Sequence, residues 1–340
     1  MKYNKLYLIG LLCTWLLFAV SCKSSNTRYL RESGERFHTF YHITYQHQEP
    51  LTEEIDSLFD AFNMILNPFD STSLIAKINR NESDDLHPML LEVLTKAEEV
   101  SRLTGGLYDV TGAPLFNIWG FGTRKGTTRE ASKEEIDSIL TFVGYTKIHL
   151  LEEEGRIEKS DPRVEINPSS LSKGYVVDLV GQLLESKGVE NYMVEIGGEI
   201  IAKGVNPSGK CWRVGINTPT EDNDATNNEI IYAVELCTKQ GVASSGDYRN
   251  YKMLNGKKVA HTINVLTGYP AHQDLLSATI IAPTSMEADA WATAFMAMGL
   301  EQSKALLEQL PQLGACLIYA DPKTGAFQTY QKGIELIPLQ

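Results

Sequence analysis

The chain has 340 residues and a formal net charge of −12, from 43 acidic and 31 basic side chains. This distributed negative charge repels phosphate backbones and anionic headgroups, so it argues against nucleic acid as a partner and against a basic membrane-binding patch. An anionic ligand would need a local cation.

The first 21 residues have the pattern of a secretory signal peptide. Two lysines precede an apolar run over residues 6–20, which is shorter than the roughly 20 residues that a membrane-spanning helix needs. Ser21 directly before Cys22 predicts cleavage there, lipidation of Cys22 and a mature protein anchored in the bacterial envelope, facing the periplasm. Ala19 stands where lipoprotein signals usually carry leucine, and the alternative is ordinary cleavage with an unmodified Cys22.

Cleavage would remove two lysines and no acid, so the mature chain would carry a formal charge of −14. The polar residues 22–36 are predicted to be a flexible tether, with the folded domain at 37–340. Cys211, Cys237 and Cys316 remain in that domain, and an odd number cannot all pair. No spacing resembles a metal cage, so isolated thiols are expected.

Six helices are predicted from hydrophobic periodicity and end signals, among them the Ser132/Glu135 capping box. They cover residues 51–66, 88–104, 170–187, 285–298 and 301–310, together with a shorter helix that begins at Ser132. Strands are predicted where β-branched and aromatic residues gather. They cover residues 192–202, 212–217, 230–236, 278–281, 317–319 and 327–330.

Helices and strands mix without strict βαβ alternation, so the predicted fold class is α+β rather than a doubly wound parallel sheet. No GxGxxG follows a strand and no Walker A loop is present, which excludes the usual nucleotide fingerprints. A nucleotide site in this chain must be built differently.

The predicted helix 285–298 carries a candidate metal site. Asp289 and Thr293 are four residues apart and therefore share one face, where a carboxylate and a hydroxyl suit Mg²⁺. The alternative is that Asp289 complements the helix dipole and Thr293 bonds to its own backbone.

Three other features are open to two interpretations each. His261, between a predicted strand and a turn, is a candidate general base or a structural hydrogen-bonding residue. The Gly197–Gly198 pair inside an apolar strand indicates either a bulge or a ligand pressing against bare backbone, or else a tight bend in a sheet. The aromatic segment 117–122 suits stacking on a flat ring or filling a core.

Six sequence motifs occur in a fixed order: GGLYDVTGAPLFNIWGFG, INPSSLSKGYVVD, YMVEIGGEIIAKG, VASSGDYRNY, HTINVLTGYP and MEADAWATAF. Together they resemble the ApbE-like family, the FAD:protein FMN transferases, over residues 37–330. The resemblance implies an α+β fold of two closely packed lobes with FAD in the cleft between them.

The resemblance also implies a role for each matching residue. Mg²⁺ would be held by Asp289, Thr293 and the main-chain carbonyl of Ser170. The flavin nucleotide would contact Phe69, Leu107, Tyr108, Asp109, Asn167, Lys173 and Ile263.

Three positions depart from the family pattern or choose within it. Asn167 stands where aspartate is common, and Phe37-His38-Thr39 stands where Met-Gly-Thr is common. Lys173 is one of two family choices, the other being glutamate, and it would give this acidic protein a local cation for a pyrophosphate.

The implied activity is Mg²⁺-dependent transfer of FMN from FAD to a threonine hydroxyl of a target protein, with release of AMP. His261 would take the hydroxyl proton, and Asp247 is the next candidate base. The implied targets are subunits of Na⁺-translocating or related membrane redox complexes. Two alternatives stay open: a periplasmic FAD pyrophosphatase and a flavin-binding lipoprotein without turnover. A metal pair with a nearby base favours catalysis, because storage needs neither.

Overall fold

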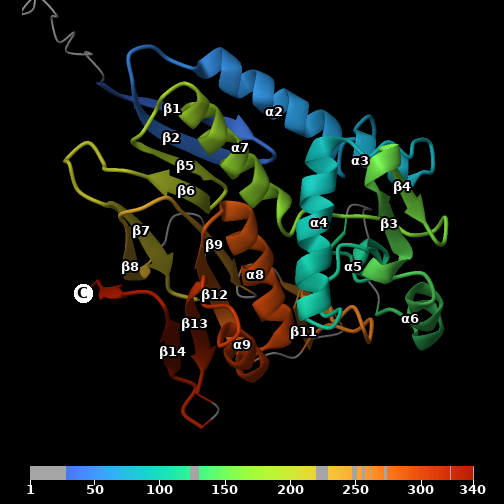
Figure 1. The fold of residues 1–340 in the computed structure, drawn as a ribbon. Coiled ribbons are helices and arrows are strands. Elements are labelled where there is room, and N and C mark those ends of the chain that lie inside the picture. The colour runs from blue at the N-terminus through green and yellow to red at the C-terminus, as the bar shows by residue number, and fades with distance from the viewer. Residues whose placement is uncertain are drawn as a thin grey trace, which may run out of the picture.

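The computed structural model describes residues 28–122, 130–219, 229–246, 251–254, 257–260, 262–271, 274–321 and 323–339. It divides into a larger lobe built on a sheet and a smaller, mainly helical lobe (Figure 1). The mixture of helices with antiparallel sheets confirms the predicted α+β class.

The larger lobe is built on an eight-stranded sheet in which all neighbouring strands are antiparallel. In spatial order its strands are β1 (Arg28–Arg36), β2 (Thr39–His47), β5 (Tyr192–Ile196), β6 (Glu199–Lys203), β9 (Gln240–Gly246), β12 (Leu275–Ala282), β13 (Gly314–Ala320) and β14 (Phe327–Lys332).

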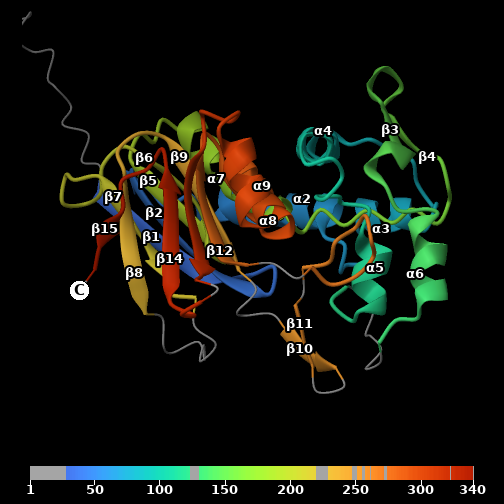
Figure 2. The same cartoon turned by 90° about the horizontal axis from the view of Figure 1, so that it is seen from below.

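Different layers cover the two faces of this sheet, as Figure 2 shows. On one face lie α7 (Ser172–Ser186), α8 (Ser285–Met298) and α9 (Leu300–Leu307), together with α2 (Thr52–Leu66). On the other face lies a three-stranded sheet in the order β15 (Ile337–Pro338), β8 (Ile230–Leu236) and β7 (Trp212–Asn217). Alternate residues of the central strands therefore belong to two separate cores, such as Ile201 under the helices and Ile200 under the small sheet.

The smaller lobe joins the larger one through α4, which packs against α8. Its elements are α3 (Leu74–Asn79), α4 (Pro88–Leu103), α5 (Ala113–Ile118), α6 (Lys133–Leu140), η1 (Tyr145–Lys147), β3 (Ile148–Leu151), η2 (Glu152–Glu154) and β4 (Arg156–Lys159). A further hairpin consists of β10 (Tyr251–Leu254) and β11 (Lys257–Ala260). Within the residues that the structure describes, no helix combines the length and apolar character required to cross a bilayer.

The predicted helices are all present, and α8 has the predicted bounds. The capping box of α6 is formed, since the Ser132 hydroxyl accepts from the Glu135 amide and the Ser132 amide donates to the Glu135 carboxylate. The sequence analysis did not predict α3 or α5; α5 occupies part of the segment expected to be an aromatic loop.

The predicted tether at residues 22–36 is wrong for residues 28–36, which form the edge strand β1. This strand pairs with β2 from Arg28↔His47 to Arg36↔Thr39. An edge strand needs only one half-buried face, and charged side chains protect its open edge from pairing with other chains. That composition resembles a spacer, so the folded domain begins earlier than residue 37.

The prediction of isolated thiols is wrong for two of the three cysteines. Cys211 and Cys237 form a disulfide, whereas Cys316 is a free, buried thiol. The register of β7 and β8 places Trp212 opposite Leu236. Cys211 precedes Trp212 and Cys237 follows Leu236, so the two cysteines also face each other across the antiparallel pair. The pairing depends on this register, which the spacing of the cysteines in the sequence does not reveal.

Candidate active site

A cavity of about 890 Å³ lies between the two lobes. Of the ten predicted site residues that the structure describes, nine line it: Leu107, Tyr108, Asp109, Asn167, Ser170, Lys173, Ile263, Asp289 and Thr293. The tenth, Phe69, does not line the cavity; its side chain is 59% exposed between α2 and α3. His261, Asp247 and Cys22 lie outside the described residues.

The close approach of α7 and α8 forms the part of the cavity where the Mg²⁺ ligands were predicted. The Gly174 amide in the first turn of α7 donates to Asp289 Oδ2 at 3.1 Å. The amide four residues after Ser170 is thereby used, and no backbone hydrogen bond to the Ser170 carbonyl occurs in the described chain. Asp289, Thr293 and Ser170, the three predicted Mg²⁺ ligands, line the same cavity.

Gly174 is required for this approach. A Cβ added at this position would lie 2.7 Å from the Met286 Cα and closer still to the Ser285 carbonyl oxygen. Asp178, one turn further along α7, accepts the amide hydrogens of Ser285 and Met286, each at 2.8 Å. The start of α8 is therefore held against α7 by backbone contact and by a carboxylate cap.

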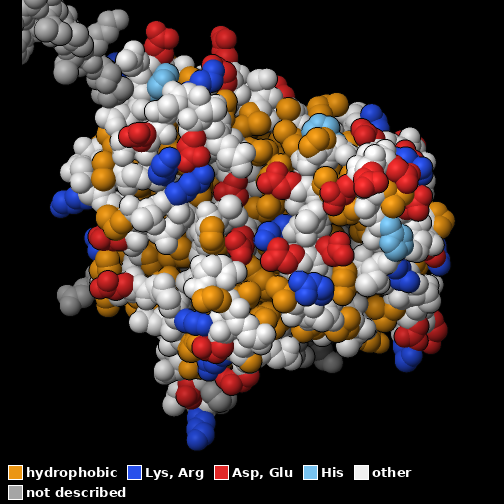
Figure 3. Space-filling view, in the orientation of Figure 1, with side chains coloured by type: hydrophobic (Ala, Val, Ile, Leu, Met, Phe, Trp, Pro, Cys, Tyr) orange, Lys and Arg blue, Asp and Glu red, His pale blue; other side chains and the backbone are white. Residues whose placement is uncertain are grey.

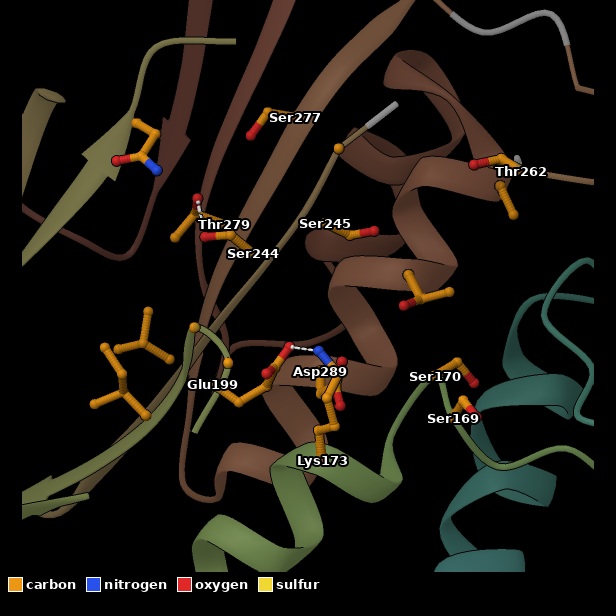
Figure 4. A pocket seen from close by; sticks show the side chains of 18 of the residues that line it. Ser169, Ser170, Lys173, Glu199, Ser244, Ser245, Thr262, Ser277, Thr279 and Asp289 are labelled. Atoms are coloured by element: carbon orange, nitrogen blue, oxygen red, sulfur yellow. Dashed lines mark hydrogen bonds and ion pairs between the residues drawn. The ribbon is translucent and has the colours of Figure 1, made fainter. Parts of the chain in front are cut away.

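Two buried carboxylates share one lysine in the same region (Figure 4). Lys173 Nζ donates to Glu199 Oε1 at 2.6 Å, while Glu199 Oε2 is buried without a hydrogen-bond partner in the described chain. Burial, followed by the charge of Glu199, raises the pKa of Asp289 well above its ordinary value. Burial also raises the pKa of Glu199, against the effect of Lys173. The cluster thus has more negative than positive groups when ionised, which favours a bound cation.

Other predicted flavin contacts are fixed by local hydrogen bonds. Asp109 accepts from the Thr111 amide and hydroxyl and from the Tyr145 amide, so both of its carboxylate oxygens are occupied. Asn167 Oδ1 accepts from the amide and hydroxyl of Ser169. The Ser170 hydroxyl donates to the Tyr108 hydroxyl at 2.8 Å, which connects the loop before α7 to the smaller lobe.

The Gly197–Gly198 pair is the two-residue turn of the β5–β6 hairpin, between the paired residues Ile196 and Glu199. Both glycines have positive φ, as such a turn requires, and both line the cavity. The tight-bend interpretation is therefore right, and bare backbone also faces the cavity. Thr39 packs against Gly197, which brings the departing Phe37-His38-Thr39 segment to this rim.

A gap in the central sheet lies beside this turn. Strand β6 pairs with β9 only from Ile200↔Val242 to Ala202↔Gln240, whereas β9 continues beside β12 as far as Gly246. Ser244 faces the small sheet and is hydrogen-bonded to Thr279 at 2.8 Å. The cavity therefore extends from the helix side of the sheet to the side that the small sheet covers.

Comparison with known proteins identifies the family. The sequence model of the ApbE family matches residues 37–317. The chain belongs to the ApbE family. The FAD:protein FMN transferase of Haemophilus influenzae is 34% identical over 313 residues, covering 88% of this chain and 89% of that protein. The enzyme of the same name from Vibrio cholerae is 35% identical over 292 residues, covering 83% and 85%.

Solved ApbE structures have the same fold. The flavin transferase ApbE from Vibrio cholerae superposes with a TM-score of 0.79 at 31% identity, over 90% of this chain and 98% of that one. The apo form of the flavinyl transferase ApbE from Pseudomonas stutzeri gives 0.77 at 27% identity, over 90% and 95%. The resemblance drawn from the six motifs is confirmed as family membership.

The sequence analysis missed three charged residues of the cavity, Glu195, Glu199 and Arg213. Glu199 is the first residue after the glycine turn and is followed by apolar residues, so a charged group in a buried strand was a detectable signal. Arg213 lies on β7 and alternates with buried Trp212 and Val214, a pattern that ordinarily marks a solvent-facing side chain.

Proposed function

We propose that this protein transfers the FMN half of FAD to a hydroxyl of another protein and releases AMP. The observation that carries the proposal is that Asp289, Thr293, Ser170 and Lys173 line one cavity at the lobe interface. The names of the family relatives support the same activity. The acidic surface of the chain, with scattered basic groups on the face seen in Figure 3, makes a local cation necessary for an anionic substrate.

The reaction breaks the pyrophosphate bond of FAD and forms a phosphoester. The acceptor oxygen bonds to the flavin-side phosphorus, the bond to the AMP phosphate breaks, and the hydroxyl loses its proton. Lys173 would contribute a positive charge near the phosphates, and the bare backbone at Gly197 and Gly198 would allow close approach of the ligand. Such fixed charges contribute several kcal/mol to stabilisation of a phosphoryl-transfer transition state.

The chemistry of the donor set fits Mg²⁺. A carboxylate, a hydroxyl and a main-chain carbonyl are hard oxygen ligands, and Asp289 and Glu199 together exceed the charge of Lys173. Bound there, Mg²⁺ would neutralise charge on the phosphate oxygens. We assign Asp289, Thr293 and the Ser170 carbonyl as its protein ligands.

The proton acceptor that we propose is His261, with Asp247 as the second candidate. Support comes from position in the chain, since Thr262 and Ile263, which follow His261 directly, line the cavity. If His261 is the base, the rate of transfer should fall by roughly 10²- to 10⁴-fold in His261→Ala while FAD affinity persists. Loss of FAD affinity together with the rate would assign His261 to binding instead.

We also propose that the protein acts outside the cytoplasm, attached to a membrane through Cys22. The signal-peptide pattern supports this location, and the Cys211–Cys237 disulfide fits an oxidising compartment. Subunits of Na⁺-translocating or related redox complexes that expose a threonine on that side are the targets that we propose. A lipid tether would raise the effective concentration of the enzyme near such membrane proteins.

The decisive experiment incubates the protein with FAD, Mg²⁺ and a candidate flavin-accepting domain and measures the mass of that domain. A mass increase equal to FMN, with AMP in equal amount, is the expected result. AMP and free FMN without a modified domain would identify a pyrophosphatase, and unchanged FAD would identify a binding protein. The Asp289→Ala variant should lose the Mg²⁺-dependent transfer activity. Calorimetry that shows no Mg²⁺ binding to the same variant would tie this loss to the metal.

A further inference from the structure

Among the residues that the structure describes, one strand at the cavity has an unpaired edge. In the three-stranded sheet β15-β8-β7, strand β7 pairs with β8 on one side only. No backbone hydrogen bond joins its residues 212–217 to any other described segment. A free edge of this kind is a template for another extended chain.

The hydrogen-bonding direction of each β7 residue follows from its neighbours. The Ile231 carbonyl accepts from Leu339, so it points toward β15 and away from β7. The direction of the backbone amide and carbonyl groups alternates from one residue of a strand to the next. The backbone groups of Tyr232 and Val234 therefore point toward β7, where these residues pair with Ile216 and Val214. Arg213 and Gly215, which alternate with these partners, therefore direct their amides and carbonyls to the free edge. The pairing shifts register after Ile216, and beyond the shift the Thr218 amide donates to the Glu229 carbonyl, so Asn217 also directs its backbone groups to the free edge.

These three residues all line the cavity, together with Val214. Val214 is buried against the central sheet, whereas Arg213 lies on the opposite, solvent-facing side of β7. Residues from both faces of β7 line the same cavity, as expected for a cavity that follows the edge of the strand. The unpaired backbone groups thus face the space that continues to Asp289 and Lys173.

The acceptor protein must bring its hydroxyl to that space. Lys173, Asp289 and Thr293 come from α7 and α8 and lie on the helix side of the central sheet. The free edge lies across the gap in the sheet, on the side of Ser244 and Thr279, so it is separate from the phosphate-binding groups. A chain segment bound along β7 could reach the phosphates through this gap.

We propose that the flavin-accepting segment of the target protein binds as an added β-strand on the free edge of β7, through the backbone groups of Arg213, Gly215 and Asn217. The inference rests on the proposed transfer activity and adds the mode of acceptor recognition. Main-chain pairing supplies affinity with little demand on sequence, and the side-chain positions beside the pairing strand supply selectivity.

The first experiment measures amide hydrogen exchange of the segment 212–217, using a flavin-accepting domain that the wild-type protein modifies. Saturation with this domain should protect about three further amides, those of Arg213, Gly215 and Asn217, since Val214 and Ile216 already bond to β8. FAD alone should leave these amides unchanged. Protection by FAD alone, or acceptor binding without protection, would overturn the proposal.

The second experiment compares two variants at one position. Arg213→Ala removes the guanidinium, and Arg213→Pro removes the guanidinium and also the amide that faces the free edge. Proline is tolerated on an edge whose amide is not used in the ladder. Arg213→Pro should raise the KM for the acceptor domain about tenfold over Arg213→Ala, with equal FAD affinity in the two variants.

The experiment with the wild-type protein distinguishes failure of the proposed transfer activity from failure of the proposed strand addition. Modification of the domain by the wild-type protein establishes the transfer activity, and equal acceptor KM values for Arg213→Pro and Arg213→Ala would then refute strand addition alone. Absence of modification with the wild-type protein would count against the transfer activity itself. Urea unfolding of each variant shows whether a change in KM comes from loss of the fold.

Discussion

Replacement of Gly174 by alanine tests whether the contact between α7 and α8 creates the proposed Mg²⁺ site. The added Cβ would lie 2.7 Å from the Met286 Cα. The atoms that it meets belong to the backbone, so the clash cannot be relieved by moving a flexible side chain. Overpacking of this kind costs about 1–3 kcal/mol, and the better helix propensity of alanine offsets about 1 kcal/mol of it. The free energy of unfolding should therefore fall by roughly 0–2 kcal/mol.

Gly181→Ala is the matched control, because Gly181 lies on the same helix. Its added Cβ would meet the side chains of Ile201 and Tyr192 at 3.2 Å, and these can adjust. The gain in helix propensity is common to both variants, so the difference between their unfolding free energies isolates the contact of α7 with α8. We expect a difference of about 1–3 kcal/mol from urea unfolding.

The functional effect of Gly174→Ala should exceed its effect on stability. The Gly174 amide donates to Asp289 at 3.1 Å and leaves the Ser170 carbonyl available. A shift of α8 away from α7 would move the proposed ligands Asp289 and Thr293 relative to that carbonyl. A displacement of about 1 Å can slow a positioned reaction roughly 10²-fold. The Mg²⁺ dependence of FMN transfer is the assay. Equal stability and equal Mg²⁺ dependence of the two variants would refute the reasoning.

Three further predictions concern groups outside the metal ligands. His38 is exposed with a φ of 59° in the β1–β2 turn, so His38→Gly should raise the unfolding free energy by about 1 kcal/mol, measured by urea unfolding; a decrease would contradict it. Burial raises the pKa of Asp178 to about 7, despite the two amides that it caps. Because this folded-state pKa lies above the unfolded one, stability should decline between pH 4 and 7 in EDTA, and Asp178→Asn should reduce the slope by up to about 1.4 kcal/mol per pH unit; an unchanged slope would exclude this role. The disulfide closes a separation of 26 residues, so replacing Cys211 and Cys237 by alanine should cost about 3.5 kcal/mol, with Cys316→Ala as the control for thiol removal; equal loss in both would reject the cross-link as the cause.

Elements with a strong local signal were predictable from the sequence. The α8 helix is apolar, begins after the Thr284 cap and ends at Gly299, so its bounds follow from residues inside and beside it. Strands β7 and β8 were found for the same reason. The edge strand β1 was missed because its stability comes from pairing with β2, and its own residues are mostly polar.

The candidate site was predictable as a set of residues but not as an arrangement. Helical spacing places Asp289 and Thr293 on one face, and the family motifs add Ser170 and Lys173. That Ser170 has an available carbonyl depends on the Gly174 amide turning to a carboxylate 115 residues away. No periodicity within either helix contains that information, because it is a property of how closely the two helices pack.

The charge of the site shows the same limit and explains why Glu199 matters. Considered alone, Asp289 and Lys173 form a balanced pair that would need no metal. Glu199 enters through the turn of a distant hairpin, takes the hydrogen bond of Lys173 and adds to the negative charge beside Asp289. Glu199, which we do not assign as a metal ligand, would therefore strengthen the binding of the proposed Mg²⁺. Because the Lys173 ammonium is bonded to Glu199 at 2.6 Å, the position of this positive charge is fixed by the fold and not by helix spacing.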